Sequence, residues 1–155
     1  MQIPSKARAV IIGGGVIGCS IAYHLGKLGW KDVVLLERKQ LTCGTTWHAA
    51  GLIAQLRATQ NMTRLAKYSQ ELYFGLEAET GVATGFKRNG SITVALTDER
   101  MEELRRSAAM ARAFGVEIDE ITPGDIAGRY PGLATGDVVG GVWLPKDGQA
   151  DPVNI

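Results

Sequence analysis

The sequence predicts an α/β fold that opens with a strand, a helix and a second strand and continues into a mixed α+β part. Two observations carry this prediction. A β-branched segment at residues 8–12 (RAVII) runs into three glycines, and the residues after them repeat apolar side chains at helical spacing. A second apolar segment follows at residues 32–37 (DVVLLE). Strand, glycine turn, helix and strand in this order form the βαβ unit of doubly wound sheets.

Local patterns justify each of these first elements. Residues 8–12 are apolar without alternation, as in a parallel strand buried on both faces, and the glycines predict a turn. A helix over residues 16–28 ends at Gly29, because glycine readily adopts the left-handed conformation that closes helices. The apolar stripe of this helix consists of Ile17, Ile21, Leu25 and Leu28. Residues 32–37 then form a second buried strand.

The next predicted helix begins at Asn61, whose side chain can cap it, and ends at Gly81. One face of this helix carries Leu65, Ser69, Leu72 and Leu76. Residues 89–96 (NGSITVAL) read as a turn that leads into a strand.

A third helix has the clearest signals in the chain. Thr97 or Asp98 caps its start and Gly115 ends it. Its apolar stripe consists of Met101, Leu104, Ala108 and Ala111. Two more strands are predicted at residues 116–121 and 138–144, and the Pro- and Gly-rich loop between them holds one helical turn.

The composition changes near residues 81–90, which predicts a boundary between two domains. Residues 1–81 then form a nucleotide-binding portion, and residues 82–155 form the start of a second, mixed α+β domain that is incomplete. The chain ends just after an Asp-Pro pair, Asp151 and Pro152, of the kind that begins a helix. A single βαβ unit also supplies too few strands for a full doubly wound sheet. We therefore expect a fragment of a longer polypeptide; the alternative is a flexible tail on a complete small protein.

The composition excludes several classes of protein. Hydrophobic residues make up 45% and charged residues 21% of the chain, as in ordinary folded domains. A net charge of +1 gives no reason to expect nucleic acid or an acidic membrane surface as a partner. Cys19 and Cys43 are too few for a disulfide framework and lack metal-ligand neighbours, so we expect no metal site. No signal peptide or membrane span fits before residue 8, and the expected location is the cytoplasm.

Three glycines, Gly13, Gly15 and Gly18, match the pattern G-x-G-x-x-G between a strand and a helix. In that context the first glycine permits the tight turn, the second lets the backbone approach a pyrophosphate and the third lets helix and strand pack closely. Glu37 closes the second strand, where its carboxylate can accept hydrogen bonds from the hydroxyls of an adenosine ribose. This Rossmann-like arrangement predicts an adenine dinucleotide, either NAD or FAD. The alternative is a glycine turn without a ligand and a solvated glutamate.

The segment at residues 38–52 (RKQLTCGTTWHAAGL) favours FAD over NAD. An NAD-binding domain usually enters its next helix directly after the second strand, whereas this segment is polar and rich in small residues. Gly44 and Gly51 permit close backbone approach, and Thr45 and Thr46 offer hydroxyls to phosphate oxygens. The segment is suited to an extended ligand.

At these residues the sequence resembles the D-amino-acid oxidase-like family of FAD-dependent oxidoreductases, and within it most closely the dimethylglycine and sarcosine dehydrogenases. The specific parts of the resemblance are residues 10–30 and 33–52. Looser parts follow at residues 89–96 (NGSITVAL), 114–117 (FGVE) and 140–152 (GGVWLPKDGQADP). The resemblance therefore covers the whole chain.

The resemblance implies a covalent bond between the imidazole of His48 and the 8α-methyl carbon of FAD. It also implies further FAD contacts from the helix start, the ribose end and the backbone of the following segment: Val16, Ile17, Glu37, Arg38, Gly44, Thr45, Thr46, Trp47, Ala49, Ala50, Gly51 and Leu52. The implied reaction oxidises a small N-methyl amine by hydride transfer to the flavin. The resulting iminium is hydrolysed to formaldehyde or captured by tetrahydrofolate in a further domain. The resemblance places the catalytic residues beyond Ile155. It does not identify the electron acceptor.

Two other functions fit the same residues. One is a non-catalytic regulatory subunit on the same scaffold, similar to that of pyruvate dehydrogenase phosphatase, and the other is a plain NAD-binding domain. The roles of two single residues also stay undecided. Trp47 packs either over the flavin or into a core, and Arg57 either meets a substrate carboxylate or is solvated.

Overall fold

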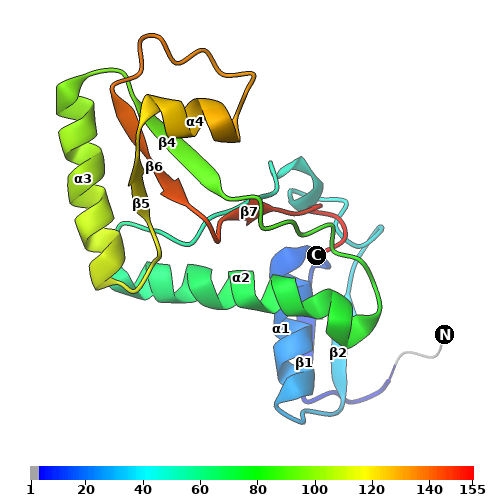
Figure 1. Ribbon diagram of the computed structural model, residues 1–155. Helices are drawn as coiled ribbons and strands as arrows, with labels where there is room; N and C mark the ends of the chain where they lie inside the picture. Colours follow the sequence, from blue (N-terminus) through cyan, green and yellow to red (C-terminus); the bar gives the residue numbers. More distant parts are fainter. Residues whose placement is uncertain (1–3) are drawn as a thin grey trace. The chain divides into compact units, whose positions relative to one another are not determined.

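The computed structural model describes residues 4–155 and shows an α/β chain (Figure 1). The contacts divide the chain into two compact units. The first unit runs up to Ala50 and includes Ile155, and the second unit comprises Gly51–Asn154. This division does not coincide with residues 81 and 82, where the composition predicts a domain boundary. A compact unit of contacts is not the same as a domain, and that boundary stays a prediction.

The first unit contains the predicted βαβ arrangement. Strand β1 (Ala9–Ile12) pairs in parallel with β2 (Val33–Leu36), and helix α1 (Val16–Lys27) connects them and packs on both. The register runs from Ala9 opposite Val33 to Ile12 opposite Leu36. Gly29 has a φ of 76°, which confirms its predicted left-handed conformation after the helix.

This first unit buries little apolar surface. Among the apolar side chains of residues 4–50, Ile11 alone is buried, whereas Ile12 is 87% and Ile17 is 75% exposed. Strands of parallel sheets are normally covered on both faces. Within the described residues, β1 pairs with β2 alone, so its other edge and part of the α1 surface lie open.

The second unit is built on two antiparallel sheets. A three-stranded sheet has the order β4 (Ser91–Ala95), β6 (Gly140–Leu144), β5 (Asp119–Ile121). A short second sheet pairs β3 (Leu52–Ile53) with β7 (Gly148–Gln149). The three strands of the first sheet confirm the strands predicted in this part of the sequence.

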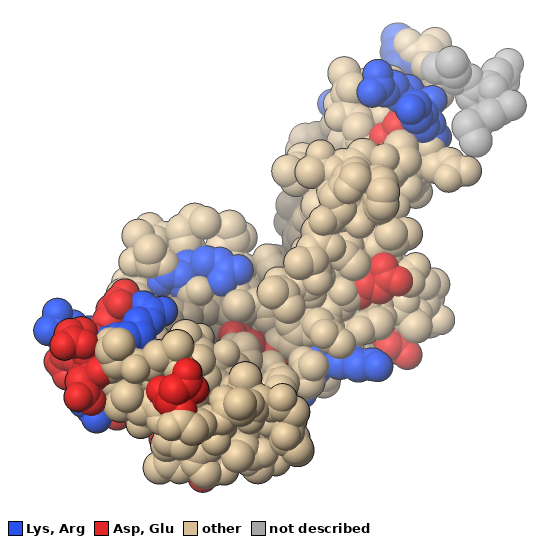
Figure 2. Space-filling model, turned by 90° about the horizontal axis from the view of Figure 1, so that it is seen from above, with Lys and Arg blue, Asp and Glu red and all other residues tan. Residues whose placement is uncertain are grey.

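Helix α3 (Asp98–Ala113) supplies the core of this unit. The hydroxyl of Thr97 accepts a hydrogen bond from the backbone N–H of Arg100, so Thr97 is the cap. The predicted stripe is buried, and it packs with the sheet in one cluster: Ala95, Met101, Leu104, Ala108, Ala111, Val116, Ile118, Val142 and Leu144. The solvent-facing side of α3 carries acidic and basic side chains side by side, visible at the left of Figure 2. These exposed ion pairs contribute little to stability.

Helix α2 (Gln60–Thr80) departs from its prediction in two respects. Thr59, rather than Asn61, caps it by accepting a hydrogen bond from the backbone N–H of Met62. Its fully buried residues are Thr63 and Gln70, not the predicted leucine face, and Leu65 is 59% exposed. The reason is that polar side chains with hydrogen-bond partners occupy the buried positions, which apolar periodicity does not detect.

The loop between the last two predicted strands contains helix α4 (Pro123–Arg129). A reciprocal pair of hydrogen bonds between Thr122 and Asp125 caps its start, and Ile126 is buried against β6. The predicted single helical turn is therefore a short, capped helix. No helix within residues 4–155 has the length and apolar character needed to cross a membrane.

Candidate dinucleotide-binding site

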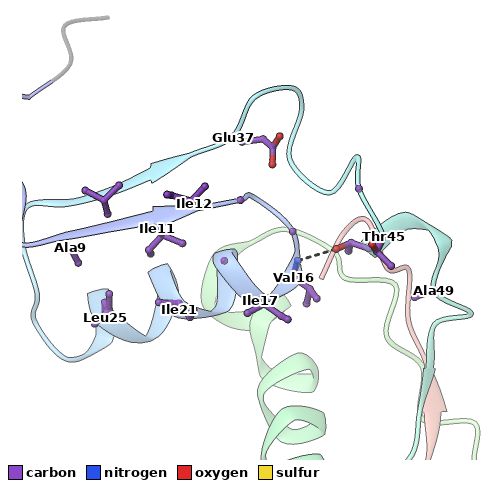
Figure 3. Close-up of a pocket in the computed structure, with 16 residues that line it drawn as sticks. Ala9, Ile11, Ile12, Val16, Ile17, Ile21, Leu25, Glu37, Thr45 and Ala49 are labelled. Atoms are coloured by element: carbon purple, nitrogen blue, oxygen red, sulfur yellow. Dashed lines mark hydrogen bonds between the residues drawn. The ribbon is translucent and has the colours of Figure 1, made fainter.

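The first unit contains an open cavity of about 970 Å³ at its glycine turn (Figure 3). This volume is at the upper end of the range typical of small-molecule sites, about 300–1,000 Å³. The cavity lies against β1, the start of α1 and the segment after β2. Its lining includes Gly13, Gly15, Val16, Ile17, Gly18, Glu37, Gly44, Thr45, Thr46 and Ala49. Ten of the residues predicted to contact the cofactor therefore lie around one cavity.

The three motif glycines each have a structural reason. Gly13 has a φ of 107°, a backbone conformation that side chains disfavour. A Cβ at Gly18 would lie 1.9 Å from the carbonyl oxygen of Gly13, so only glycine permits this close packing of helix and turn. A Cβ at Gly15 would lie 3.1 Å from the hydroxyl of Thr46 and would intrude on the cavity. The motif thus keeps the turn free of side chains where a pyrophosphate would approach.

The start of α1 is suited to bind an anion. Its cap residue is Gly15, which offers no side-chain cap, and no acidic residue lies in the first turn. The backbone N–H of Val16 donates to the hydroxyl of Thr46 at 3.0 Å (Figure 3). No acidic side chain of the first turn offsets the positive end of the helix dipole, which faces a cavity, an arrangement that binds phosphate groups in nucleotide-binding proteins.

The carboxylate of Glu37 is held by the backbone. One oxygen accepts the N–H of Gly14 at 2.8 Å and the other accepts the N–H of Lys39 at 3.0 Å. The hydrogen bond from Gly14, with a smaller one from Lys39, lowers the pKa of Glu37 below its ordinary value, so the group is ionised at neutral pH. A carboxylate has about four acceptor sites, and two remain for ribose hydroxyls. Arg38 beside it is exposed and does not line the cavity.

The segment after β2 turns around a short 3₁₀ helix, η1 (Thr46–His48). The backbone N–H of His48 donates to the carbonyl of Thr45, and its ring lies 3.8 Å from that of Trp47, centre to centre. Both rings are exposed. Within the described residues the imidazole forms no hydrogen bond. Trp47, His48 and Ala50 do not line the cavity, although their neighbours Thr45, Thr46 and Ala49 do.

The last two predicted contacts, Gly51 and Leu52, belong to the second unit. Gly51 has a φ of 71°, and a Cβ there would lie 2.2 Å from the carbonyl oxygen of Ala150. Close approach to the backbone of Ala150 therefore explains this glycine without a ligand. Leu52 is 74% exposed in β3. The roles of these two residues in cofactor binding stay predictions.

The sequence reasoning missed part of the cavity lining. The further residues come from the open edge of β1 and the flank of α1: Ala9, Val10, Ile11, Ile12, Ile21 and Leu25. Figure 3 shows Ile11 pointing from the strand towards the helix. The apolar pattern of residues 8–12 predicts a strand covered on both faces, but it does not say that a cavity lies along it.

Comparisons with known proteins identify the family of the chain. The family model described as FAD dependent oxidoreductase matches residues 8–155. Sarcosine dehydrogenase of Homo sapiens is 41% identical over 97% of this chain, and dimethylglycine dehydrogenase of Homo sapiens is 42% identical over 99%. The pyruvate dehydrogenase phosphatase regulatory subunit of Mus musculus is 39% identical over the whole chain.

The chain spans less than a fifth of the length of these relatives, 16%, 18% and 18% respectively. Among solved structures, L-proline dehydrogenase from P. horikoshii superimposes with a TM-score of 0.89 at 32% identity, over 97% of this chain and 39% of that one. The match with the family model covers nearly the whole chain and includes the glycine turn, Glu37 and the segment around His48. The chain therefore belongs to the family of FAD-dependent oxidoreductases.

Proposed function

We propose that this chain forms the flavin-binding part of an enzyme that oxidises N-methyl amines such as sarcosine or dimethylglycine, with His48 as the covalent attachment point of FAD. The similarity to sarcosine and dimethylglycine dehydrogenases supports the class of substrate. The family supports FAD rather than NAD as the cofactor. A bound flavin supplies a hydride acceptor for the carbon next to the amine nitrogen.

The residues of the first unit fit this cofactor. The side-chain-free turn at Gly13, Gly15 and Gly18 leaves space for a pyrophosphate beside the uncapped start of α1. The ionised Glu37 has acceptor sites left for ribose hydroxyls, and it would repel a ribose 2′-phosphate.

The state of His48 is the observation that carries the covalent part of the proposal. Its imidazole is exposed, forms no hydrogen bond within the described residues, and lies in the same short helix as Thr46, which lines the cavity. An imidazole nitrogen with a free lone pair can act as a nucleophile. A histidine packed into a structural hydrogen-bond network would not meet this requirement.

Acid precipitation of the full-length protein tests the attachment. We expect the flavin to remain with the denatured polypeptide of the wild type and to be released into the supernatant by His48→Ala. The matched control is His24→Ala, which removes the only other histidine of the chain and lies outside the cavity lining. Release of flavin from the wild type would contradict covalent attachment, and retention by His48→Ala would contradict the choice of residue.

Anaerobic mixing with sarcosine or dimethylglycine tests the reaction. We expect the flavin absorption near 450 nm to bleach as the flavin is reduced. The second candidate function is a non-catalytic regulatory subunit, which the 39% identity to such a subunit over the whole chain favours. That candidate predicts no bleaching by either amine, although dithionite would still reduce the flavin.

Three further expectations complete the proposal. Because the chain spans less than a fifth of the length of these relatives, we expect the catalytic residues in the part of such a protein that it does not cover, and no turnover by the 155 residues alone. Tetrahydrofolate captures the released one-carbon unit in another domain. The protein works in the cytoplasm, although the names of the mammalian relatives place those proteins in mitochondria.

A further inference from the structure

The second unit contains a surface cavity of about 270 Å³, which we call the Asp147 cavity. Its lining comes from β3, the start of β4, β7 and the turns beside them, all within the second unit. One wall is apolar and consists of Leu52, Ile53, Ala54 and Ile92. The volume lies just below the range typical of small-molecule sites, about 300–1,000 Å³. The cavity therefore suits a ligand of only a few heavy atoms.

Asp147 is the one charged residue in this lining, and it is only 3% exposed. Its carboxylate accepts the backbone N–H of Gln55 at 2.9 Å and the hydroxyl of Ser91 at 2.7 Å, and both donors are neutral. Within residues 4–155 no lysine or arginine forms an ion pair with Asp147. Its neighbour in sequence, Lys146, pairs with Glu117 at 3.4 Å instead. Buried charges in proteins are normally paired, so Asp147 lacks the counter-charge that its burial favours.

The lining has more hydrogen-bond acceptors than the chain itself uses. A carboxylate has about four acceptor sites, and the two hydrogen bonds to Asp147 occupy two of them. The amide oxygens of Asn89 and Gln149 and the phenol oxygen of Tyr130 are further acceptors of the lining. These three side chains form no hydrogen bond within the part of the chain that the structure describes. A ligand with several N–H donors would satisfy these acceptors.

The composition of the lining favours an organic cation over a metal ion. Among residues 4–155 no group of three or more histidine, cysteine, aspartate or glutamate side chains could hold a metal ion. The aromatic ring of Tyr130 attracts cations through its face, and the apolar wall can bury methyl groups. An ammonium group that carries a short alkyl part matches both the acceptors and the wall.

We propose that the Asp147 cavity binds the ammonium group of a small alkylamine. Asp147 is the counter-ion, the free acceptors of the lining take the remaining N–H donors, and the apolar wall contacts the alkyl part. Binding involves no covalent or redox step. This inference does not rest on the proposed function, because it uses neither the flavin nor any residue of the first unit.

Titration of the full-length protein with tert-butylammonium at constant ionic strength tests the site. The carbon next to the nitrogen of this amine carries no hydrogen, so the amine cannot pass a hydride to a flavin. Isoleucine methyl signals in the NMR spectrum, assigned by substitution to valine, report where it binds. We expect the signals of Ile53 and Ile92 to shift, while that of Ile118, in the core cluster, stays in place. The neutral analogue tert-butanol has nearly the same shape and should bind about 30-fold more weakly.

Substitution of Asp147 separates its charge from its structural hydrogen bonds. Asp147→Asn keeps a side chain that can bond to Gln55 and Ser91 but loses the charge. It should weaken tert-butylammonium binding about 30-fold and leave tert-butanol binding nearly unchanged. The matched control Asp137→Asn changes an exposed aspartate outside the lining and should bind both compounds as the wild type does.

A second variant keeps the test decisive if Asp147→Asn fails to fold. Tyr130→Phe removes one neutral acceptor at an exposed position and should weaken tert-butylammonium binding about 3-fold. Three results would overturn the site: no shift of Ile53 and Ile92 at amine concentrations that leave Ile118 unshifted, equal binding of tert-butanol and tert-butylammonium by the wild type, or unweakened amine binding by folded Asp147→Asn.

Discussion

In the second unit, α3 and the three-stranded sheet bury a continuous apolar cluster, in which Leu104 is only 4% exposed. In the first unit, β1 and α1 leave Ile12 and Ile17 more than 70% exposed, and Ile11 is the one buried apolar side chain among residues 4–50. Apolar burial is the main favourable term in folding. The second unit therefore buries the larger apolar core, whereas the apolar side chains of β1 and α1 contribute less burial to the folding of the first unit.

The two units also differ in the hydrogen bonds that their polar groups form. In the second unit, the buried carboxylate of Asp147 accepts the backbone N–H of Gln55 and the hydroxyl of Ser91, and Gln55 also bonds to Gln70. These bonds join the segment after β3 to β4 and α2 inside the unit, and they give the buried side chains of Gln55, Gln70 and Asp147 hydrogen-bond partners. In the first unit, Glu37 and the start of α1 keep acceptor and donor capacity that faces the cavity. The first unit is organised for a ligand and the second for internal packing.

The largest expected effect is the loss of the α3 core. Leu104→Ala should lower the free energy of unfolding of the second unit by about 3 kcal/mol, because it leaves a cavity in the buried cluster. Ile17→Ala is the matched control in the first unit, where the side chain is 75% exposed and the cost should stay below about 0.5 kcal/mol. Hydrogen exchange of peptides from α3 and α1, measured by mass spectrometry, reports each unit separately. Equal effects of the two substitutions would contradict the difference in burial.

The same contrast explains which elements the sequence predicts well. The βαβ unit and α3 depend on local signals, namely glycine conformation, capping and apolar spacing, and the structure confirms both. For α2 the expected face was wrong, because Thr63 and Gln70 are buried with hydrogen-bond partners: the backbone of Arg57, six residues before Thr63, and the carbonyl of the distant Lys146. Such partners are known only after the chain is folded.

The candidate site was partly predictable because part of it is a local sequence motif. The glycine turn and Glu37 form a short-range motif, and ten predicted residues meet around the cavity. The walls from Val10 and Ile12 were missed, because covered strands of parallel sheets show the same apolar pattern with or without a cavity beside them. A smaller cavity of about 290 Å³ in the second unit escaped prediction too, since its walls come from separate parts of the sequence, among them Ile53 of β3 and Tyr73 of α2.

The next effect concerns ligand binding by the first unit. In His48→Ala, which cannot attach the cofactor covalently, free FAD at 100 times its dissociation constant should stabilise β1 and α1 against exchange by roughly 2.7 kcal/mol and leave α3 unchanged. Gly18→Ala should abolish this stabilisation, because its Cβ would lie 1.9 Å from the carbonyl oxygen of Gly13. Gly26→Ala is the matched control in the same helix, since a Cβ there meets no atom within 4 Å. Stabilisation of Gly18→Ala by FAD, equal to that of the control, would contradict the proposed binding mode.

The smallest expected effect is the pH dependence of the first unit through Glu37. Backbone hydrogen bonds, chiefly from Gly14, lower the pKa of this carboxylate below its ordinary value of 4.5, so the folded chain releases this proton at a lower pH than the unfolded chain does. The contribution of Glu37 to stability is therefore fully present above pH 4.5 and is lost as the pH falls through the lowered pKa. Glu37→Gln should make β1 and α1 exchange faster than in the wild type at neutral pH, and this difference should shrink in acid. The control Glu77→Gln, on the exposed surface of α2, should leave exchange in the first unit unchanged at every pH. A difference between Glu37→Gln and the wild type that persists undiminished in acid would show that the carboxylate charge is not what holds the glycine turn.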